Sequence, residues 1–153
     1  LGCGPGRFTA ALAVRGIAAL GVDISAVAVA MTKRRGGRAL HQDVFAPLPG
    51  YGRWANVLLA DGNIGIGGDP VRTLHLARQL VAPDGLVIAE IGTLATGVTR
   101  EYLRWETDHS VGEWFPWAHV GSDAVGALAE STDLRIMHTV ETFGRLIAAM
   151  RVA

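Results

Sequence analysis

The sequence predicts an α/β fold: a doubly wound, mostly parallel sheet that ends in an antiparallel hairpin. Apolar runs of strand length alternate with helix-length segments, and glycine or proline stands at most of the boundaries between them. Near the carboxyl end, two strand-like segments are separated only by Phe143 and Gly144. That is too short for a right-handed crossover, so the two segments are expected to pair as a hairpin. No repeat or low-complexity linker divides the 153 residues, and we expect one domain over residues 1–153.

The first part of the chain is expected to hold two helices and two buried strands. Residues 8–15 form the first helix, which Gly16 ends as a C-terminal cap, and residues 18–24 follow as a strand. Ser25 is placed to cap a second, alanine-rich helix that a pair of glycines ends. Residues 38–44 then form the next strand.

The middle of the chain continues this alternation. Residues 54–60 are apolar with one exception, which is typical of a strand buried on both faces. Asp69 and Pro70 suit the N-cap and the first position of a helix that runs to about Val81, because proline has no N–H to leave unpaired there. A turn then leads into a strand over residues 86–91.

The two ends of the chain differ from this pattern. Residues 122–130 are expected as a last helix, and residues 134–142 and 145–152 as the strands of the hairpin. At the other end, Leu1 opens directly into the kind of glycine-rich loop that leaves a first strand. We therefore expect that strand to precede Leu1 and the sequence to lack the N-terminal part of its domain, which would leave two strand edges unpaired.

Charge and composition narrow the possible functions. The 14 basic and 14 acidic residues balance, so there is no basic stripe to suit a nucleic-acid backbone. No apolar run approaches the ~18 residues of a membrane span, so no membrane partner is expected. The only cysteine, Cys3, has no second cysteine for a disulfide or a zinc site. This favours a reducing, cytoplasmic location and no metal.

A glycine-rich loop and a carboxylate one strand later point to a nucleoside cofactor. Gly2, Gly4 and Gly6 precede a helix, and glycines allow positive φ and a close approach of a ligand to the backbone. Asp23 ends the next strand, where a carboxylate can accept hydrogen bonds from both ribose hydroxyls. The alternative is a tight turn with an unrelated aspartate. A dinucleotide fingerprint needs a small residue where Arg7 stands, which disfavours NAD and FAD.

The sequence here resembles the class I S-adenosylmethionine-dependent methyltransferases. The resemblance is carried by LGCGPG (residues 1–6), GVDIS (21–25), HQDV (41–44) and PDGLV (83–87). It implies a Rossmann-like fold whose closing strands form the terminal hairpin, and S-adenosylmethionine as the cofactor. The residues that it implies as cofactor contacts are Gly2, Gly4, Gly6, Asp23, Ile24, Asp43, Val44, Ala60 and Asp61.

The resemblance also assigns roles to these positions. The glycines would border the methionine and ribose portions, and Asp23 would bind the ribose hydroxyls. Ile24 would pack on the adenine face. Asp43 would accept from the adenine amino group, and the Val44 N–H would donate to a ring nitrogen.

A second glycine cluster, over residues 61–69, follows a strand at the sheet edge where ligands of such folds bind. In the family, its start at Ala60 and Asp61 flanks the methionine end of the cofactor and the methyl group. The stretch DGNIGIGGDP resembles one found in a subgroup of small bacterial methyltransferases, and it is not the motif of amino-directed nucleic-acid methyltransferases. The alternative for its later glycines is a flexible approach to the cap at Asp69.

Residues 93–120 are the least regular part of the chain. We expect them to cover the cofactor and to form the acceptor pocket, with His109 or His119 as the catalytic base. The alternative is that the aromatic side chains fill a satellite core and that both histidines are solvated. The aromatic residues concerned are Tyr102, Trp105, Trp114, Phe115 and Trp117.

The function predicted from these features is methyl transfer from S-adenosylmethionine to a small-molecule acceptor by in-line displacement. Such an enzyme mainly has to align the two reactants, so the sequence specifies cofactor residues better than catalytic ones. Two alternatives stay open: a non-catalytic nucleoside-binding module of the same fold, and an NAD-dependent oxidoreductase. The sequence does not specify an oligomeric state.

Overall fold

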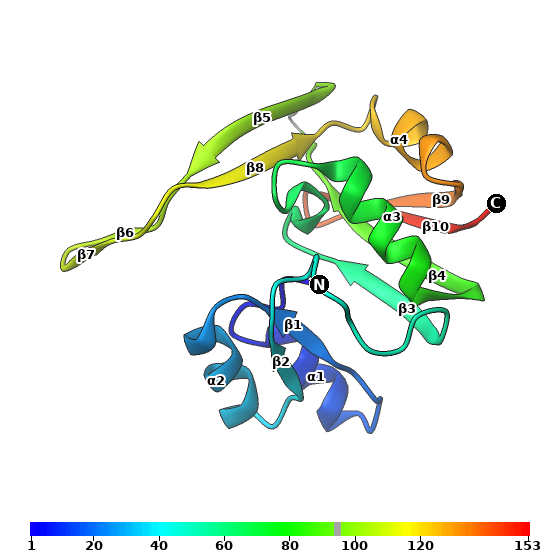
Figure 1. The fold of residues 1–153 in the computed structure, drawn as a ribbon. Coiled ribbons are helices and arrows are strands. Elements are labelled where there is room, and N and C mark those ends of the chain that lie inside the picture. Colours follow the sequence, from blue (N-terminus) through cyan, green and yellow to red (C-terminus); the bar gives the residue numbers. More distant parts are fainter. Residues whose placement is uncertain (94–95) are drawn as a thin grey trace. The chain divides into compact units, whose positions relative to one another are not determined.

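The computed structural model describes residues 1–93 and 96–153 (Figure 1). The contacts divide the chain into two compact units, Leu1–Pro49 and Gly50–Ala153. In the part of the chain that the structure describes, no helix has the length and apolar character needed to cross a membrane. The expectation of one domain over residues 1–153 stays a prediction.

The first unit contains two helices and a pair of short parallel strands. They are α1 (Arg7–Val14), β1 (Gly21–Asp23), α2 (Ala26–Arg34) and β2 (Ala39–His41). The strand pairing runs from Gly21↔Ala39 to Asp23↔His41. The expected strands over residues 18–24 and 38–44 are therefore too long, because the ladder joins only three residues on each side.

The helix ends of this unit follow the local signals in the sequence. The Ser25 side chain accepts a hydrogen bond from the Ala28 N–H at 3.2 Å, which caps α2. Gly16 and Gly36, just beyond the two helices, have φ of +70° and +83°. Left-handed glycines at these positions end helices at little cost, so both predicted ends are confirmed.

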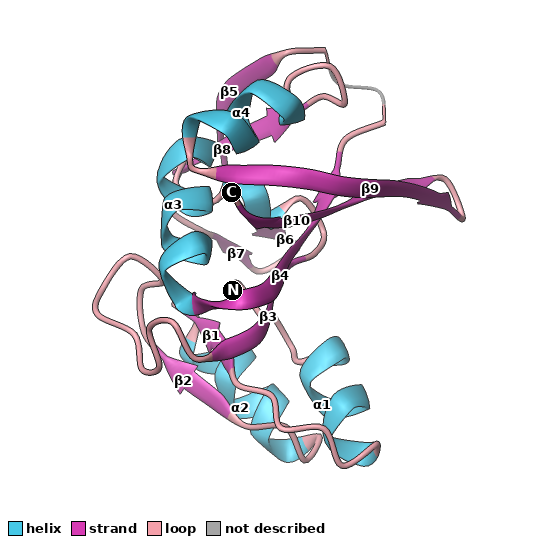
Figure 2. Ribbon diagram, turned by 90° about the vertical axis from the view of Figure 1, so that its right-hand side faces the viewer, coloured by secondary structure: helices cyan, strands magenta, loops and turns pink. Residues whose placement is uncertain are grey.

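The second unit is built around a four-stranded sheet in the order β3-β4-β10-β9 (Figure 2). Its strands are β3 (Trp54–Leu59), β4 (Val81–Ile91), β9 (Leu134–Thr142) and β10 (Arg145–Val152). β3 and β4 are parallel, and β10 is antiparallel to both of its neighbours. The predicted hairpin strands agree with β9 and β10 at both ends.

Two helices pack against this sheet. Helix α3 (Pro70–Leu80) begins where Asp69 Oδ1 accepts from the Arg72 N–H at 3.0 Å, as the Asp-Pro signal predicts. Helix α4 (Val125–Ser131) begins three residues later than expected, because residues 121–124 form a turn that the Ala124 N–H closes on Gly121 O. α3 contacts β4 and α4 contacts β9, and the two helices also contact each other, so they cover the same face.

The core of this unit lies between the helices and the sheet. Its most deeply buried large side chains include Leu59 of β3, Leu74 of α3, Val87 of β4, Leu134 of β9 and Met150 of β10. The expectation that residues 54–60 are buried on both faces is wrong for the first half of β3, where Ala55 and Asn56 are exposed. The ladder is irregular there: its register jumps from Trp54↔Val81 to Asn56↔Leu86, across the segment that contains Pro83.

Residues 93–120 form a long β-hairpin arm rather than an irregular covering; residues 94–95 of this segment lie outside the described residues. β5 (Val98–Leu103) pairs antiparallel with β8 (Phe115–Val120). The tip holds the short pair β6 (Glu106–Thr107) and β7 (Ser110–Val111) (Figure 1). The sequence did not reveal the arm, because β5 is largely exposed and shows no apolar alternation to mark it as a strand.

Candidate functional site

The first glycine loop is packed on one side and open on the other. Gly2, Gly4 and Gly6 all have positive φ, of 64°, 51° and 80°. A Cβ on Gly6 would lie 2.4 Å from the Thr32 hydroxyl oxygen, whereas a Cβ on Gly4 would meet nothing within 4 Å. The loop backbone can therefore rest on α2 and still present a bare surface at Gly4.

Hydrogen bonds from several parts of the unit hold this loop in place. The Cys3 N–H donates to Val22 O at 3.0 Å, and the Gly4 N–H donates to Asp23 Oδ2 at 2.7 Å. The hydroxyl of Thr32, a fully buried residue of α2, lies 3.1 Å from Gly4 O, to which it donates. The sequence analysis missed Thr32; the signal for it is a polar residue on the inner face of an alanine-rich helix.

The lone cysteine belongs to this packing and not to a reactive centre. Cys3 Sγ lies 3.9 Å from the Thr32 hydroxyl, and a Cβ on Gly21 would come within 2.7 Å of it. Burial is the main cause that raises the pKa of the Cys3 thiol above its ordinary value. The thiol is therefore protonated at neutral pH and a poor nucleophile.

Asp23 joins the glycine loop to the end of β1. Its Oδ2 accepts from Gly4 and its Oδ1 accepts from the Ser25 N–H at 2.9 Å. A carboxylate has about four acceptor positions, so these bonds leave acceptor capacity for two more donors.

The other predicted cofactor residues of the first unit follow its two strands. Ile24 comes directly after β1 and is 72% exposed. Asp43 follows β2, is exposed, and accepts from the Phe45 N–H at 2.9 Å. Val44 has a buried side chain, so only its backbone could face a ligand. Because β1 and β2 are parallel, these residues lie at the same edge of the pair.

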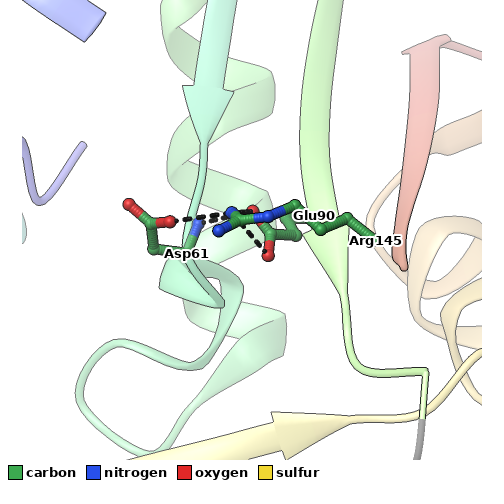
Figure 3. A network of polar contacts seen from close by, with 3 residues as sticks. All are labelled: Asp61, Glu90 and Arg145. Atoms are coloured by element: carbon green, nitrogen blue, oxygen red, sulfur yellow. Dashed lines mark hydrogen bonds and ion pairs between the residues drawn. The ribbon is translucent and has the colours of Figure 1, made fainter. Parts of the chain in front are cut away.

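In the second unit, Ala60 and Asp61 follow β3. Ala60 is buried, and Asp61 has a left-handed backbone with φ of 55°. Figure 3 shows that the Asp61 carboxylate faces Arg145, the first residue of β10, which also faces Glu90 of β4. Arg145 Nη1 donates to Asp61 Oδ1 at 3.0 Å and to the two Glu90 oxygens at 3.1 and 2.9 Å.

This network was not expected from the sequence. The hydrogen bond to Asp61 and the charge of Glu90 raise the pKa of the Arg145 guanidinium, which stays charged at any physiological pH. The signal for Glu90 is that it is the only charged residue in the apolar run of residues 86–91. No comparable signal marks Arg145, whose position depends on the pairing of β10 with β4.

The second glycine cluster is a packed segment and not simply a flexible approach to α3. It contains the short 3-10 helix η1 (Asn63–Gly65). A Cβ on Gly65 would fall 1.7 Å from Ala118 O of β8, so only glycine fits there. Arg100 Nε of β5 donates to Gly68 O at 2.9 Å, which ties the cluster to the arm.

A hollow of about 250 Å³ lies between this cluster and the arm. It is lined by Gly67, Gly68, Arg100, Glu101, Tyr102, Pro116 and Trp117. The alternative of a satellite core does not hold for three of the aromatic residues, because Tyr102, Trp105 and Trp114 are 67%, 78% and 59% exposed. Phe115 and Trp117 are half-buried and meet edge to face.

The two candidate bases lie in different parts of the arm. His109 is exposed in the turn between β6 and β7. His119 lies on β8, where its Nε2 is hydrogen-bonded to Glu101 Oε1 of β5. The structure therefore brings His119, through Glu101, to the hollow and leaves His109 at the tip. Among residues 1–93 and 96–153, no group of three or more His, Cys, Asp or Glu side chains could hold a metal ion.

Comparison with known proteins identifies the family. A family model described as a methyltransferase domain matches residues 1–89. The chain belongs to this methyltransferase family. No curated protein matches the sequence.

Solved methyltransferase structures share the fold across 99% of this chain. A SAM-dependent methyltransferase from Bacteroides fragilis, in complex with S-adenosyl-L-homocysteine, has a TM-score of 0.83 at 21% identity, over 70% of its own chain. The CcbJ methyltransferase from Streptomyces caelestis has a TM-score of 0.77 at 16% identity, over 81% of its chain. The 1,6-didemethyltoxoflavin-N1-methyltransferase from Burkholderia thailandensis has a TM-score of 0.73 at 16% identity, over 68% of its chain.

These findings confirm the predicted fold and family. The protein is a class I S-adenosylmethionine-dependent methyltransferase with a Rossmann-like fold, and S-adenosylmethionine is its cofactor. The family match favours this assignment over the NAD-dependent oxidoreductase that the sequence left open.

The first unit of the methyltransferase fits this cofactor. The remaining acceptor capacity of Asp23 matches the two donors of a ribose diol. The open side of Gly4 would let a ligand reach the backbone. The exposed side chain of Ile24 is available to an aromatic base.

Proposed function

We propose that the methyltransferase acts on a small-molecule acceptor and transfers the methyl group by in-line displacement. The observation that carries this proposal is the hollow of about 250 Å³ whose lining includes Glu101, the hydrogen-bond partner of His119. Pockets for small ligands span roughly 300–1,000 Å³, so a hollow of this size suits one group of a small molecule. The Burkholderia thailandensis structure, which contains bound 1,6-didemethyltoxoflavin, is that of an enzyme with a small acceptor.

The position of the arm supports this assignment. The Gly92 N–H, one residue beyond β4, donates to Val120 O of β8 at 3.0 Å. His119, the neighbour of Val120, therefore lies close to the carboxyl end of β4. Ligands of open α/β sheets bind at the carboxyl ends of parallel strands, which favours an acceptor in this part of the unit.

The roles of the remaining residues are those that the resemblance to the family implies, and they form part of the proposal. Asp23 holds the ribose hydroxyls against the open glycine loop of Gly2, Gly4 and Gly6. Ile24 covers the adenine face. The Asp43 carboxylate and the Val44 N–H form hydrogen bonds with the edge of the adenine ring. Ala60 and Asp61 border the methionine end.

The chemistry requires little beyond alignment. S-adenosylmethionine supplies a methyl group on a positively charged sulfur, which leaves as a neutral thioether when the acceptor lone pair forms its bond to the methyl carbon. The chain has to hold the acceptor in line with the carbon–sulfur bond. Holding two reactants in this alignment lowers the activation free energy by roughly 7–11 kcal/mol. With its Nε2–H donating to Glu101, His119 has the basic lone pair on Nδ1, which accepts the proton that an N–H or O–H acceptor loses.

The test uses methyl-labelled S-adenosylmethionine and the whole protein. The two are incubated with a bacterial extract, the mixture is separated into small molecules, protein and nucleic acid, and the label is counted in each fraction. We expect the label in the small-molecule fraction, with a rate at least ten-fold lower for His119→Ala than for His109→Ala, since general base catalysis contributes about 10²–10⁴-fold. Label confined to protein or nucleic acid would contradict a small acceptor.

A further inference from the structure

Asp61 has a backbone conformation that needs support from its surroundings. Its φ of 55° is in the left-handed region, and the next residue, Gly62, has φ of 76°. Few residues other than glycine adopt this conformation; aspartate tolerates it better than most, and neighbouring groups can hold it at functional sites. Asp61 lies two residues beyond β3, at the carboxyl edge of the parallel pair β3–β4.

Two residues from other strands hold Asp61 by both its backbone and its side chain. The Asp61 N–H donates to Glu90 Oε2 at 3.0 Å. Arg145 Nη1 donates to Asp61 Oδ1 at 3.0 Å and, at the same time, to both Glu90 oxygens (Figure 3). The two groups thus fix the peptide plane and the side chain of one residue.

We propose that Glu90 and Arg145 are positioning residues for methyl transfer, which keep Asp61 and the loop after β3 in the conformation that borders the reacting methyl group. This inference rests on the proposed role of Asp61 at the methionine end of the cofactor. Neither Glu90 nor Arg145 has to touch the cofactor or the acceptor. They act through Asp61.

The exposure of the network of Asp61, Glu90 and Arg145 argues that the network contributes more to the conformation of the site than to the stability of the fold. The side chains of Arg145 and Asp61 are 45% and 54% exposed, and that of Glu90 is 21% exposed. Ion pairs with this exposure contribute little to stability. The pairing of β10 with β4 and β9 extends from Leu146 to Val152 in any case. Loss of the network should therefore disturb the loop and leave the sheet intact.

The experiment compares Arg145→Gln, Arg145→Lys and Glu90→Gln with Arg151→Gln. Arg151 is an exposed arginine at the far end of the same strand, which makes it a matched control. S-adenosylhomocysteine affinity is measured by calorimetry and unfolding by thermal denaturation. We expect Arg145→Gln and Glu90→Gln to weaken binding about ten-fold, the scale of a charge-assisted hydrogen bond. Arg145→Lys should recover part of the loss, and the unfolding temperatures should match that of the control.

Asp61→Ala separates failure of this inference from failure of the proposed role of Asp61. If Asp61→Ala binds S-adenosylhomocysteine as tightly as the unchanged protein, the proposed role is wrong. If Asp61→Ala weakens binding but Arg145→Gln and Glu90→Gln behave like Arg151→Gln, the positioning inference is overturned and the proposed function stands.

A double variant tests whether Arg145 acts through Asp61. When Asp61 is already alanine, Arg145→Gln should cause no further loss of affinity, because there is no carboxylate left to position. Two full, independent losses would show that Arg145 acts by another route, and would also overturn the inference.

Discussion

Under the proposed function, Asp23 has two tasks. Its carboxylate accepts from the Gly4 N–H at 2.7 Å and so shapes the glycine loop, and it keeps acceptor capacity for a ribose. A substitution there should therefore change both the loop and the direct contact. A substitution of Gly6 should also change the loop, because the missing Cβ of Gly6 leaves the space that Thr32 fills.

Asp23→Ala should weaken the binding of S-adenosylhomocysteine by about 1.5–3 kcal/mol, the usual contribution of hydrogen bonds to a charged group. Calorimetry measures this directly. Asp84→Ala, at an exposed aspartate, serves as the control and should leave the affinity unchanged. An unaltered affinity for Asp23→Ala would remove this residue from the cofactor site.

Gly6→Ala should destabilise the protein more than Gly16→Ala does. Both glycines have positive φ, of 80° and 70°, so both substitutions carry the left-handed strain of roughly 1–2 kcal/mol. Only at Gly6 would the new Cβ also collide with Thr32, whereas at Gly16 it meets nothing within 4 Å. Chemical denaturation of both variants should show an additional loss of about 1–3 kcal/mol for Gly6→Ala. Equal losses would mean that Thr32 moves aside freely.

Local signals and long-range pairing define different elements of this fold. The caps at Ser25 and Asp69 form as predicted, because a side chain and a backbone N–H three residues apart meet without help from the rest of the chain. The β5–β8 arm was not predicted, because pairs such as Val98↔Val120 depend on a ladder between distant residues.

The β9–β10 hairpin carries a turn residue that its geometry does not favour. Phe143 has φ of 49° and is fully exposed, and Gly144 has φ of 71°. Turns with positive φ at both central residues favour Asn-Gly. Phe143→Asn should therefore stabilise the protein by about 1 kcal/mol, which raises the unfolding temperature by roughly 2–4 °C in a chain of this size.

The control for this substitution is Phe143→Ala. It removes the same exposed ring but keeps a residue that tolerates positive φ poorly, so its unfolding temperature should change less than that of Phe143→Asn. A rise of equal size in both variants would trace the effect to loss of the ring and not to the turn.

For the molecule as a whole, charge makes a nucleic-acid acceptor unfavourable. The 14 basic and 14 acidic residues give a formal net charge of zero, and phosphate contacts supply most of the sequence-independent affinity for nucleic acids. In a mobility-shift assay at about 0.15 M salt, we expect no complex with duplex DNA or tRNA at micromolar protein. A salt-dependent complex would contradict this expectation.

The features that could be predicted from the sequence are those that depend on neighbouring residues. The helix caps and a hairpin whose strands are separated by two residues form over short distances along the chain. The methyltransferase family could be inferred for the same reason, since each of its motifs is a short run of adjacent residues.

The remaining features result from contacts between residues that are far apart in the chain. Arg145 reaches Asp61 across 84 positions, and Thr32 reaches the glycine loop across 28. Gly65 lies under Ala118 O in a space without room for a side chain. Such contacts depend on strand register and helix packing, which arise when the core assembles and which local propensities do not encode.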